Sequence, residues 1–261
     1  MTKEYTIKRN FTTIEIPRRN GTKLKFAYPP RGPTFDFYKV CQEIREEGFH
    51  PATGPEVIAL LYATYGSTKS WETREITEKT ITNERNESLD AGHTLCFTAI
   101  VDDLKKNRTY FVDNPILRSR KSSEEDYFKL DTMDLDARIA VGKGVRSCDA
   151  REGKPNRHVS AFSFYADSWK SLSAEATKTS PFVKALLGKE GAEQLSTLLK
   201  RKEFPKELRI KTSLQGGENS RRYNLLEIDG WRSRHGDESL TLLCGDQHPS
   251  FLKMIYMVKH Q

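Results

Sequence analysis

The sequence predicts an α+β fold, in which a mainly antiparallel sheet carries helices near residues 34–66 and 180–201. Segments near both ends of the chain alternate apolar with polar residues, as strands with one buried face do. Two other regions repeat apolar residues at helical spacing. No regular alternation of strands with helices runs along the chain, which argues against a parallel sheet. With 261 residues, the chain is long enough to bury a sizeable core.

An antiparallel hairpin is expected at the start of the chain. Residues 11–16 and 23–28 both alternate apolar with polar side chains. Between them lies Asn20-Gly21, the residue pair preferred in tight hairpin turns. The proline-rich segment 29–33 should then end the second strand.

Two helices are expected next. The first, at about 34–47, carries Phe37, Cys41 and Ile44 on one stripe, so that stripe should face the core. The second, at about 53–66, is apolar on nearly all sides, which predicts a buried helix.

The middle of the chain is expected to supply two strands, at 95–101 and 109–113, joined by a polar turn. A strand followed by a short helix should occupy 130–140, and 118–126 has the composition of a surface loop. The segment 142–158 is rich in Gly, Arg and Lys and is expected to be an exposed loop.

The last third predicts one strand, two helices and a group of short strands. The strand is 159–165, and the helices are 180–187 and 190–201, with a joint at 188–191. The short strands are expected at 207–214, 223–229, 239–244 and 252–259.

Charge is distributed unevenly along this basic chain, whose net charge is +7. Residues 1–40 hold 9 basic and 3 acidic residues, a net charge of +6. Residues 41–140 hold 13 and 19, a net charge of −6, and residues 141–261 hold 21 and 14, a net charge of +7. This segregation is compatible with a basic face that binds phosphates. The alternative is that folding brings the acidic middle against the basic ends.

A cytoplasmic protein without a membrane partner is expected. The cysteines, at positions 41, 96, 148 and 244, have no paired spacing, which favours reduced thiols over a disulfide framework. The first residues contain no apolar stretch of the signal-peptide kind. No apolar run approaches the roughly 18 residues of a transmembrane helix.

Nucleotide-binding motifs are absent from the sequence. No Gly-x4-Gly-Lys-Ser/Thr segment occurs. Gly142-Lys143-Gly144 begins like a dinucleotide fingerprint, but Ser147 stands where the third glycine should be. We therefore expect no cofactor of this kind, and no other cofactor is indicated.

A zinc site is one hypothesis for the histidines and cysteines. His93 and Cys96 are three residues apart, and Cys244 and His248 are four apart, so the two pairs together offer two imidazoles and two thiolates. Only the fold could bring the pairs together. The alternative is that Cys96 and Cys244 are small apolar residues buried in strands.

A thiol nucleophile is a second hypothesis. Cys148 lies between Arg146 and Arg151, and neighbouring cations lower the pKa of a thiol. Its polar segment should be exposed, and His158 is the candidate base. The alternative is an exposed cysteine near a histidine without a catalytic role.

A basic, aromatic-rich C-terminal face supports the leading functional hypothesis, a binding protein that contacts nucleic acid. Basic residues interleave with aromatic ones there, a pattern suited to phosphate contacts with bases stacked on rings. The expected phosphate contacts are Arg209, Lys211, Arg221, Arg222, Arg232 and Arg234. The alternatives are a solvated basic sheet face, a hydrolase-type enzyme with a Cys/His or zinc site, and a scaffolding protein.

Several short stretches resemble a family of uncharacterised hypothetical proteins from archaeal genomes. They are residues 31–34, 48–51, 56–62, 95–97, 110–115, 180–182 and 188–193. The resemblance covers roughly half of the chain and implies one shared architecture, with no established activity. It favours a single domain over 1–261, and a weak boundary near 116–128 is the alternative.

Overall fold

The structure is a computed structural model. It describes residues 12–18, 21–34, 37–64, 93–103, 105–106, 108–119, 128–149, 168–201, 204–212, 221–232, 238–243 and 253–261. The strand expected at 159–165 lies outside these ranges, as does most of the loop expected at 142–158.

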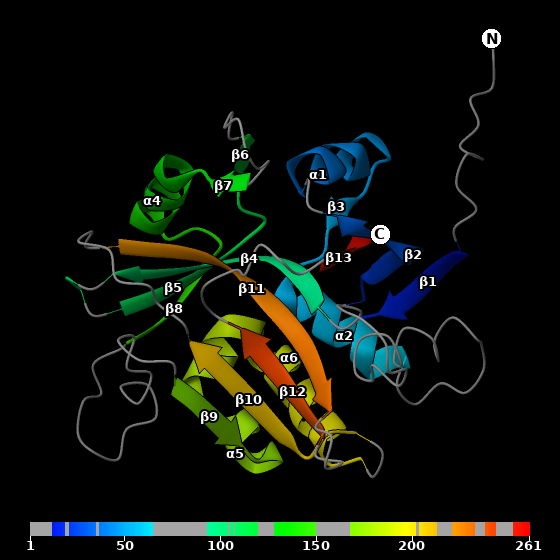
Figure 1. The fold of residues 1–261 in the computed structure, drawn as a ribbon, viewed down its shortest axis with the longest axis vertical. Helices are drawn as coiled ribbons and strands as arrows, with labels where there is room; N and C mark the ends of the chain where they lie inside the picture. Colours follow the sequence, from blue (N-terminus) through cyan, green and yellow to red (C-terminus); the bar gives the residue numbers. More distant parts are fainter. Residues whose placement is uncertain are drawn as a thin grey trace.

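A large mixed sheet runs through the molecule (Figure 1). Its strands are β1 (Thr12–Pro17), β2 (Lys23–Thr34), β3 (His50–Pro51), β4 (His93–Asp103), β5 (Arg108–Asp113), β8 (Val145–Asp149), β9 (Ser168–Leu172), β10 (Glu207–Thr212), β11 (Arg221–Arg232), β12 (Glu238–Leu243) and β13 (Lys253–His260). The main order is β1-β2-β13-β4-β11-β12-β10-β9, and β5 branches from β4 to pair with β8. β6 (Leu117–Ser119) and β7 (Phe128–Leu130) form a separate pair.

Helices cover both faces of the sheet (Figure 1). They are α1 (Phe37–Glu46), α2 (Gly54–Thr64), α4 (Thr132–Val141), α5 (Ala174–Thr179) and α6 (Pro181–Leu199). Successive residues of β4 belong to two different cores: Cys96 packs with α2 and α6, whereas Phe97 packs with α1 and α4. Because neighbouring strand residues point to opposite faces, the two cores lie on opposite sides of the sheet.

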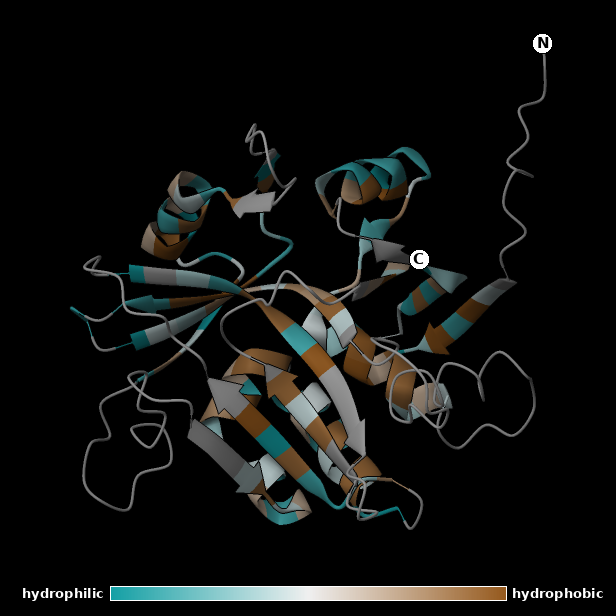
Figure 2. Ribbon diagram, viewed as in Figure 1, coloured by the Kyte–Doolittle hydropathy of each residue, from teal (hydrophilic) through white to brown (hydrophobic). Residues whose placement is uncertain are grey.

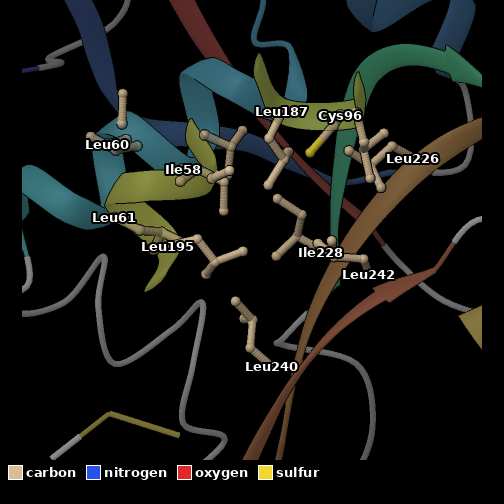
Figure 3. Close-up of a cluster of buried hydrophobic side chains, with 14 of the residues drawn as sticks. Ile58, Leu60, Leu61, Cys96, Leu187, Leu195, Leu226, Ile228, Leu240 and Leu242 are labelled. Atoms are coloured by element: carbon tan, nitrogen blue, oxygen red, sulfur yellow. The ribbon is translucent and has the colours of Figure 1, made fainter. Parts of the chain in front are cut away.

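The core beneath α2 and α6 is built mainly from aliphatic side chains, with aromatic ones such as Phe111, Phe182 and Tyr256 among them. Figure 3 shows side chains of the two helices meeting those of three strands; the labelled residues are Ile58, Leu60, Leu61, Cys96, Leu187, Leu195, Leu226, Ile228, Leu240 and Leu242. Hydrophobic residues alternate with more polar ones along β10 and β11 (Figure 2), as expected for strands whose two faces differ.

The α+β class is confirmed, but the sheet is mixed rather than purely antiparallel. β10 pairs with β12 in parallel, and β13 meets β4 in parallel at Met254 and Thr94. The helices at 34–66 and 180–201 are confirmed as α1, α2 and α6. The four expected C-terminal strands are present as β10 to β13.

The N-terminal hairpin is confirmed, but its second strand is longer than predicted. β1 pairs with β2 from Thr12↔Tyr28 to Pro17↔Lys23. β2 then continues through the prolines to Thr34. β1 does not extend along this part, and the pairing with β13 shifts register there. Prolines are tolerated at such positions, because few ladder hydrogen bonds need their missing N–H groups.

Candidate functional site

A cluster of two histidines and one glutamate forms where α2 begins. His50 of β3 pairs with Val258 of β13, two residues before His260. Residues two apart on a strand share a face, so both histidines lie on the same side of the paired strands. α2 starts four residues after His50 and places Glu56 in its first turn.

The three side chains converge on one carboxylate oxygen. His260 Nε2 lies 2.7 Å from Glu56 Oε1, and His50 Nε2 lies 3.9 Å from the same atom. The imidazole rings are stacked, with centroids 5.2 Å apart and planes inclined by 30°. The candidate ligand atoms all lie within 4.8 Å of one another.

Thr53 fixes the orientation of the glutamate. Its backbone N–H and its Oγ1–H each donate to Glu56 Oε2, both over 2.8 Å. This is half of a helix capping box, in which a glutamate in the first turn accepts from the N-cap residue. The side chain of Glu56 is only 7% exposed. One carboxylate oxygen is therefore held by the helix cap, and the other faces the histidines.

A backbone carbonyl fixes the tautomer of His50. Its Nδ1 lies 3.1 Å from Pro51 O, which can only accept a hydrogen bond. Nδ1 therefore carries the proton in the neutral ring, and the lone pair of Nε2 faces Glu56. Histidines that bind metals are oriented by hydrogen bonds of this kind.

Glu56 and His260 form part of the wall of a cavity of about 320 Å³. The cavity lies between the end of β1, the start of α2, the end of β5, the start of β8 and the middle of α6. At that point α6 is interrupted, since Gly188 has φ 75° and ψ 166°. The joint predicted at 188–191 is therefore confirmed, and residues 188–191 all line the cavity.

Arg146 and Asp113 form an ion pair on the same wall. Arg146 Nη2 donates to Asp113 Oδ1 over 2.9 Å, and Nη1 donates to Oδ2. Nε and Nη2 of Arg146 also donate to the carbonyls of Ala185 and Leu186, over 2.8 and 3.0 Å. Arg146 thus joins β8 and β5 to the segment of α6 just before its break.

The network continues from Asp113 into α2. Thr98 Oγ1 donates to Asp113 Oδ1 over 2.7 Å and accepts from the N–H of Gly54 over 3.0 Å. This chain of hydrogen bonds fixes the first turn of α2, which carries Glu56, relative to β4 and β5.

The structure contradicts the premises of the thiol hypothesis. Cys148 lies in β8, paired with Thr109 of β5, and its side chain packs in the core with α2 and α6. Burial raises the pKa of the Cys148 thiol to about 12, with contributions from the carboxylates of Asp102 and Asp149. The prediction of an exposed loop with a low thiol pKa was wrong, because backbone pairing with β5 makes a strand of this polar segment. His158 lies outside the described residues.

Of the four proposed zinc ligands, the structure describes the side chain of Cys96 alone. Cys96 is completely buried among apolar side chains, which agrees with the alternative reading for this residue. Only the backbone of His93 is described, and Cys244 and His248 lie outside the described ranges. A site built from all four stays a prediction.

The basic C-terminal residues are described in part. Arg221 pairs with Asp136 over 2.6 Å and with Asp103 over 2.8 Å. Burial lowers the pKa of Arg221, but hydrogen bonds to the two carboxylates outweigh it and raise the pKa above its ordinary value. Arg209 is half-buried in β10. For Lys211, Arg222 and Arg232 only the backbone is described, and Arg234 lies outside the described ranges.

The pairing of Arg221 explains part of the charge segregation in the sequence. Asp103 and Asp136 belong to the acidic middle of the chain, and Arg221 belongs to the basic end. Folding therefore neutralises some of the basic excess internally. This agrees with the alternative that the acidic middle of the chain packs against its basic ends. Nucleic-acid contacts by the remaining basic residues stay a prediction.

Comparisons with protein-family models, with curated proteins and with solved structures found no match. The resemblance to archaeal hypothetical proteins stays a prediction. Within the described ranges, none of the helices is both long and apolar enough to cross a membrane.

The sequence patterns did not predict the His50–Glu56–His260 cluster. One local signal was present: Thr53 and Glu56 have the spacing of a capping box, which places the glutamate in the first turn of a helix. Nothing local connects that turn to His260, which is 204 residues further along the chain.

Proposed function

We propose that the protein is a metal-dependent enzyme of the hydrolase type, with His50, Glu56 and His260 as the metal ligands. The observation that carries this proposal is the convergence of two imidazole nitrogens and one carboxylate oxygen within 4.8 Å, at a place where Glu56 and His260 line a cavity. Two histidines and one glutamate are a ligand set of catalytic zinc sites, in which the remaining position is left to water or substrate.

The surroundings of the cluster fit this role. Glu56 is oriented by Thr53, and in the neutral tautomer of His50 whose Nδ1 donates to Pro51 O, the unprotonated nitrogen is Nε2. Binding a metal requires His260 Nε2 to lose the proton that it shares with Glu56 Oε1. The 2.7 Å contact between these atoms must also open, since both would then lie roughly 2.0–2.2 Å from the ion.

The cavity offers one further group for hydrolysis. A zinc-type ion lowers the pKa of a bound water to about 7 and so supplies a nucleophile at neutral pH. The carboxylate of Asp113 is engaged in the ion pair with Arg146. Glu190 lines the same cavity and does not belong to that ion pair, so it is the candidate general base.

Hydrolysis by the metal-loaded protein tests the proposal. We expect ester or phosphodiester hydrolysis after loading with zinc or cobalt(II), and its loss on chelation. Glu56→Gln should abolish the activity, and Glu190→Gln should lower it by about 100-fold or more while the metal stays bound. Glu175→Gln makes the same chemical change on an exposed side chain of α5 and should leave the activity unchanged.

Two outcomes would count against a hydrolase. One is metal-dependent activity that survives Glu56→Gln, which would place the reactive ion elsewhere. The other is a site that binds iron(II) but neither zinc nor cobalt(II), since the same ligand set also occurs in iron oxygenases.

A further inference from the structure

We propose that the substrate of this site carries an anionic oxygen group, a phosphate or a carboxylate, which Arg18 and Lys189 bind beside the metal. The inference rests on the proposed function, because it treats the 320 Å³ cavity as the substrate site.

The basic residues that line the cavity differ in their availability. Arg146 is occupied, because it donates to Asp113 and to two carbonyls of α6. Arg18 follows β1 and Lys189 follows the break in α6, and both line the cavity. Among the described residues, neither side chain has an ion pair or a hydrogen bond. These two cations are therefore free to bind a ligand.

The charge balance of the cavity depends on the metal. Three basic side chains line it (Arg18, Arg146 and Lys189), and three carboxylates oppose them (Glu56, Asp113 and Glu190), so the lining is formally neutral when the histidines are neutral. A divalent ion adds two positive charges, while the number of carboxylates in the lining stays the same. The loaded cavity therefore has an excess of positive charge in a partly enclosed space, where electrostatic attraction is strengthened.

This arrangement predicts a coupling between metal binding and anion binding. The metal and the anion should each raise the affinity of the protein for the other, and by the same factor, because coupling between two binding sites is reciprocal. An anion that binds the ion alone would show the coupling without depending on Arg18 or Lys189. An anion that also contacts the two cations would depend on both.

A second hollow, of about 490 Å³, adjoins the cavity. It is lined by residues of α2 and α6, and it shares Ile16, Pro17, Ala59, Glu190 and Gln194 with the first. The anionic group would thus lie at the metal end, and the remainder of the substrate has room along the two helices.

The test measures the binding of inorganic phosphate and of acetate to the full chain, metal-free and loaded with cobalt(II), by calorimetry. We expect the loaded protein to bind at least one of the two anions about 10-fold or more tightly than the metal-free protein. Preference for phosphate or for acetate then identifies the anionic group. Arg18→Gln combined with Lys189→Gln should weaken anion binding by about 10-fold or more and leave the affinity for cobalt(II) within about twofold.

Lys184→Gln is the matched control, since Lys184 is exposed on α6 and lines neither hollow. The inference is overturned if the double variant binds both anions as tightly as the unaltered protein, or if neither anion binds the loaded protein. Failure of cobalt(II) to bind would instead refute the proposed function. In that case, an anion site would still be supported if the metal-free protein binds phosphate and the double variant does not.

Discussion

His260 and Glu56 are in direct contact: His260 Nε2 lies 2.7 Å from Glu56 Oε1, although 204 residues separate them in the chain. The last strand of the sheet brings this histidine to the first turn of α2. Since β3 joins β13 at the same place, His50 approaches the same oxygen. The sheet topology therefore creates the cluster by joining residues that are far apart in the sequence.

Thr53 is expected to hold Glu56 for metal binding. In Thr53→Ala the hydroxyl donor to the carboxylate is lost, while the backbone N–H donor remains. We expect the affinity for cobalt(II) to fall by about 10–100-fold. The metal-free protein should lose about 1 kcal/mol of unfolding free energy in urea, the typical net contribution of one hydrogen bond. Thr53→Ser keeps the hydroxyl and should restore both quantities; equal affinities for the alanine and serine variants would contradict this role.

The Arg146–Asp113 pair is expected to contribute more to stability than another ion pair between the same two strands. Arg108 and Asp149 also join β5 to β8, but both side chains are well exposed. Arg146→Lys cannot make the two parallel hydrogen bonds to Asp113 and should lower the unfolding free energy by about 2 kcal/mol. Arg108→Lys should cost less than about 1 kcal/mol. Similar losses in the two variants, measured by urea denaturation, would contradict this ranking.

Local signals explain which parts of the fold could be predicted. The β1–β2 hairpin has alternating strands around a turn-forming pair, and α2 is a run of residues that is apolar on nearly all sides. Both are specified by residues close in sequence, so both were predicted. The break at Gly188 was also indicated locally, by the glycines at 188 and 191 within a helical pattern.

The wrong and missing predictions concern contacts between distant segments. β8 has the composition of a loop and is a strand because β5 pairs with it. β2 continues beyond Pro29 because β13 supports it. The candidate site joins residues from the first quarter of the chain to its last strand, and no spacing in the sequence records that contact.

Cys148 is expected to be unreactive in the folded protein. At pH 8 its thiol, with a pKa of about 12, is almost fully protonated and is buried in the core. Alkylation at Cys148, followed by mass spectrometry, should therefore be slow in buffer and rapid in denaturant. Rapid alkylation of the native protein at this residue would contradict the buried position.

The same pKa predicts a loss of stability at alkaline pH. Below the ordinary pKa of 9.0 the thiol is protonated in both the folded and the unfolded state, so its contribution is fully present. Between pH 9 and about 12 the unfolded chain loses this proton and the folded protein keeps it, so the unfolding free energy falls as pH rises. Cys148→Ala should show a shallower decline over this window; identical slopes would rule out the contribution.

Gly188 is expected to tolerate no side chain without loss of stability. Its φ of 75° and ψ of 166° lie in a region used almost only by glycine, so Gly188→Ala should cost about 1–3 kcal/mol. Gly142, which ends α4, has φ 73° and ψ 0°, a left-handed conformation that asparagine also adopts. Gly142→Asn should therefore be nearly neutral and Gly188→Asn should not. Equal losses in urea denaturation would contradict this distinction.

The central claim is that His50, Glu56 and His260 bind a metal ion, and cobalt(II) titration of the metal-free protein tests it most directly. We expect one cobalt(II) ion to bind per chain, with a visible absorption that reports nitrogen and oxygen ligands. In Glu56→Gln and His260→Ala the affinity should fall by more than about 100-fold, since losing a ligand costs more than losing its hydrogen-bond partner. Glu175→Gln should bind as the unaltered protein does. Equal cobalt(II) affinity in all four proteins, or no binding to the unaltered protein, would contradict the claim.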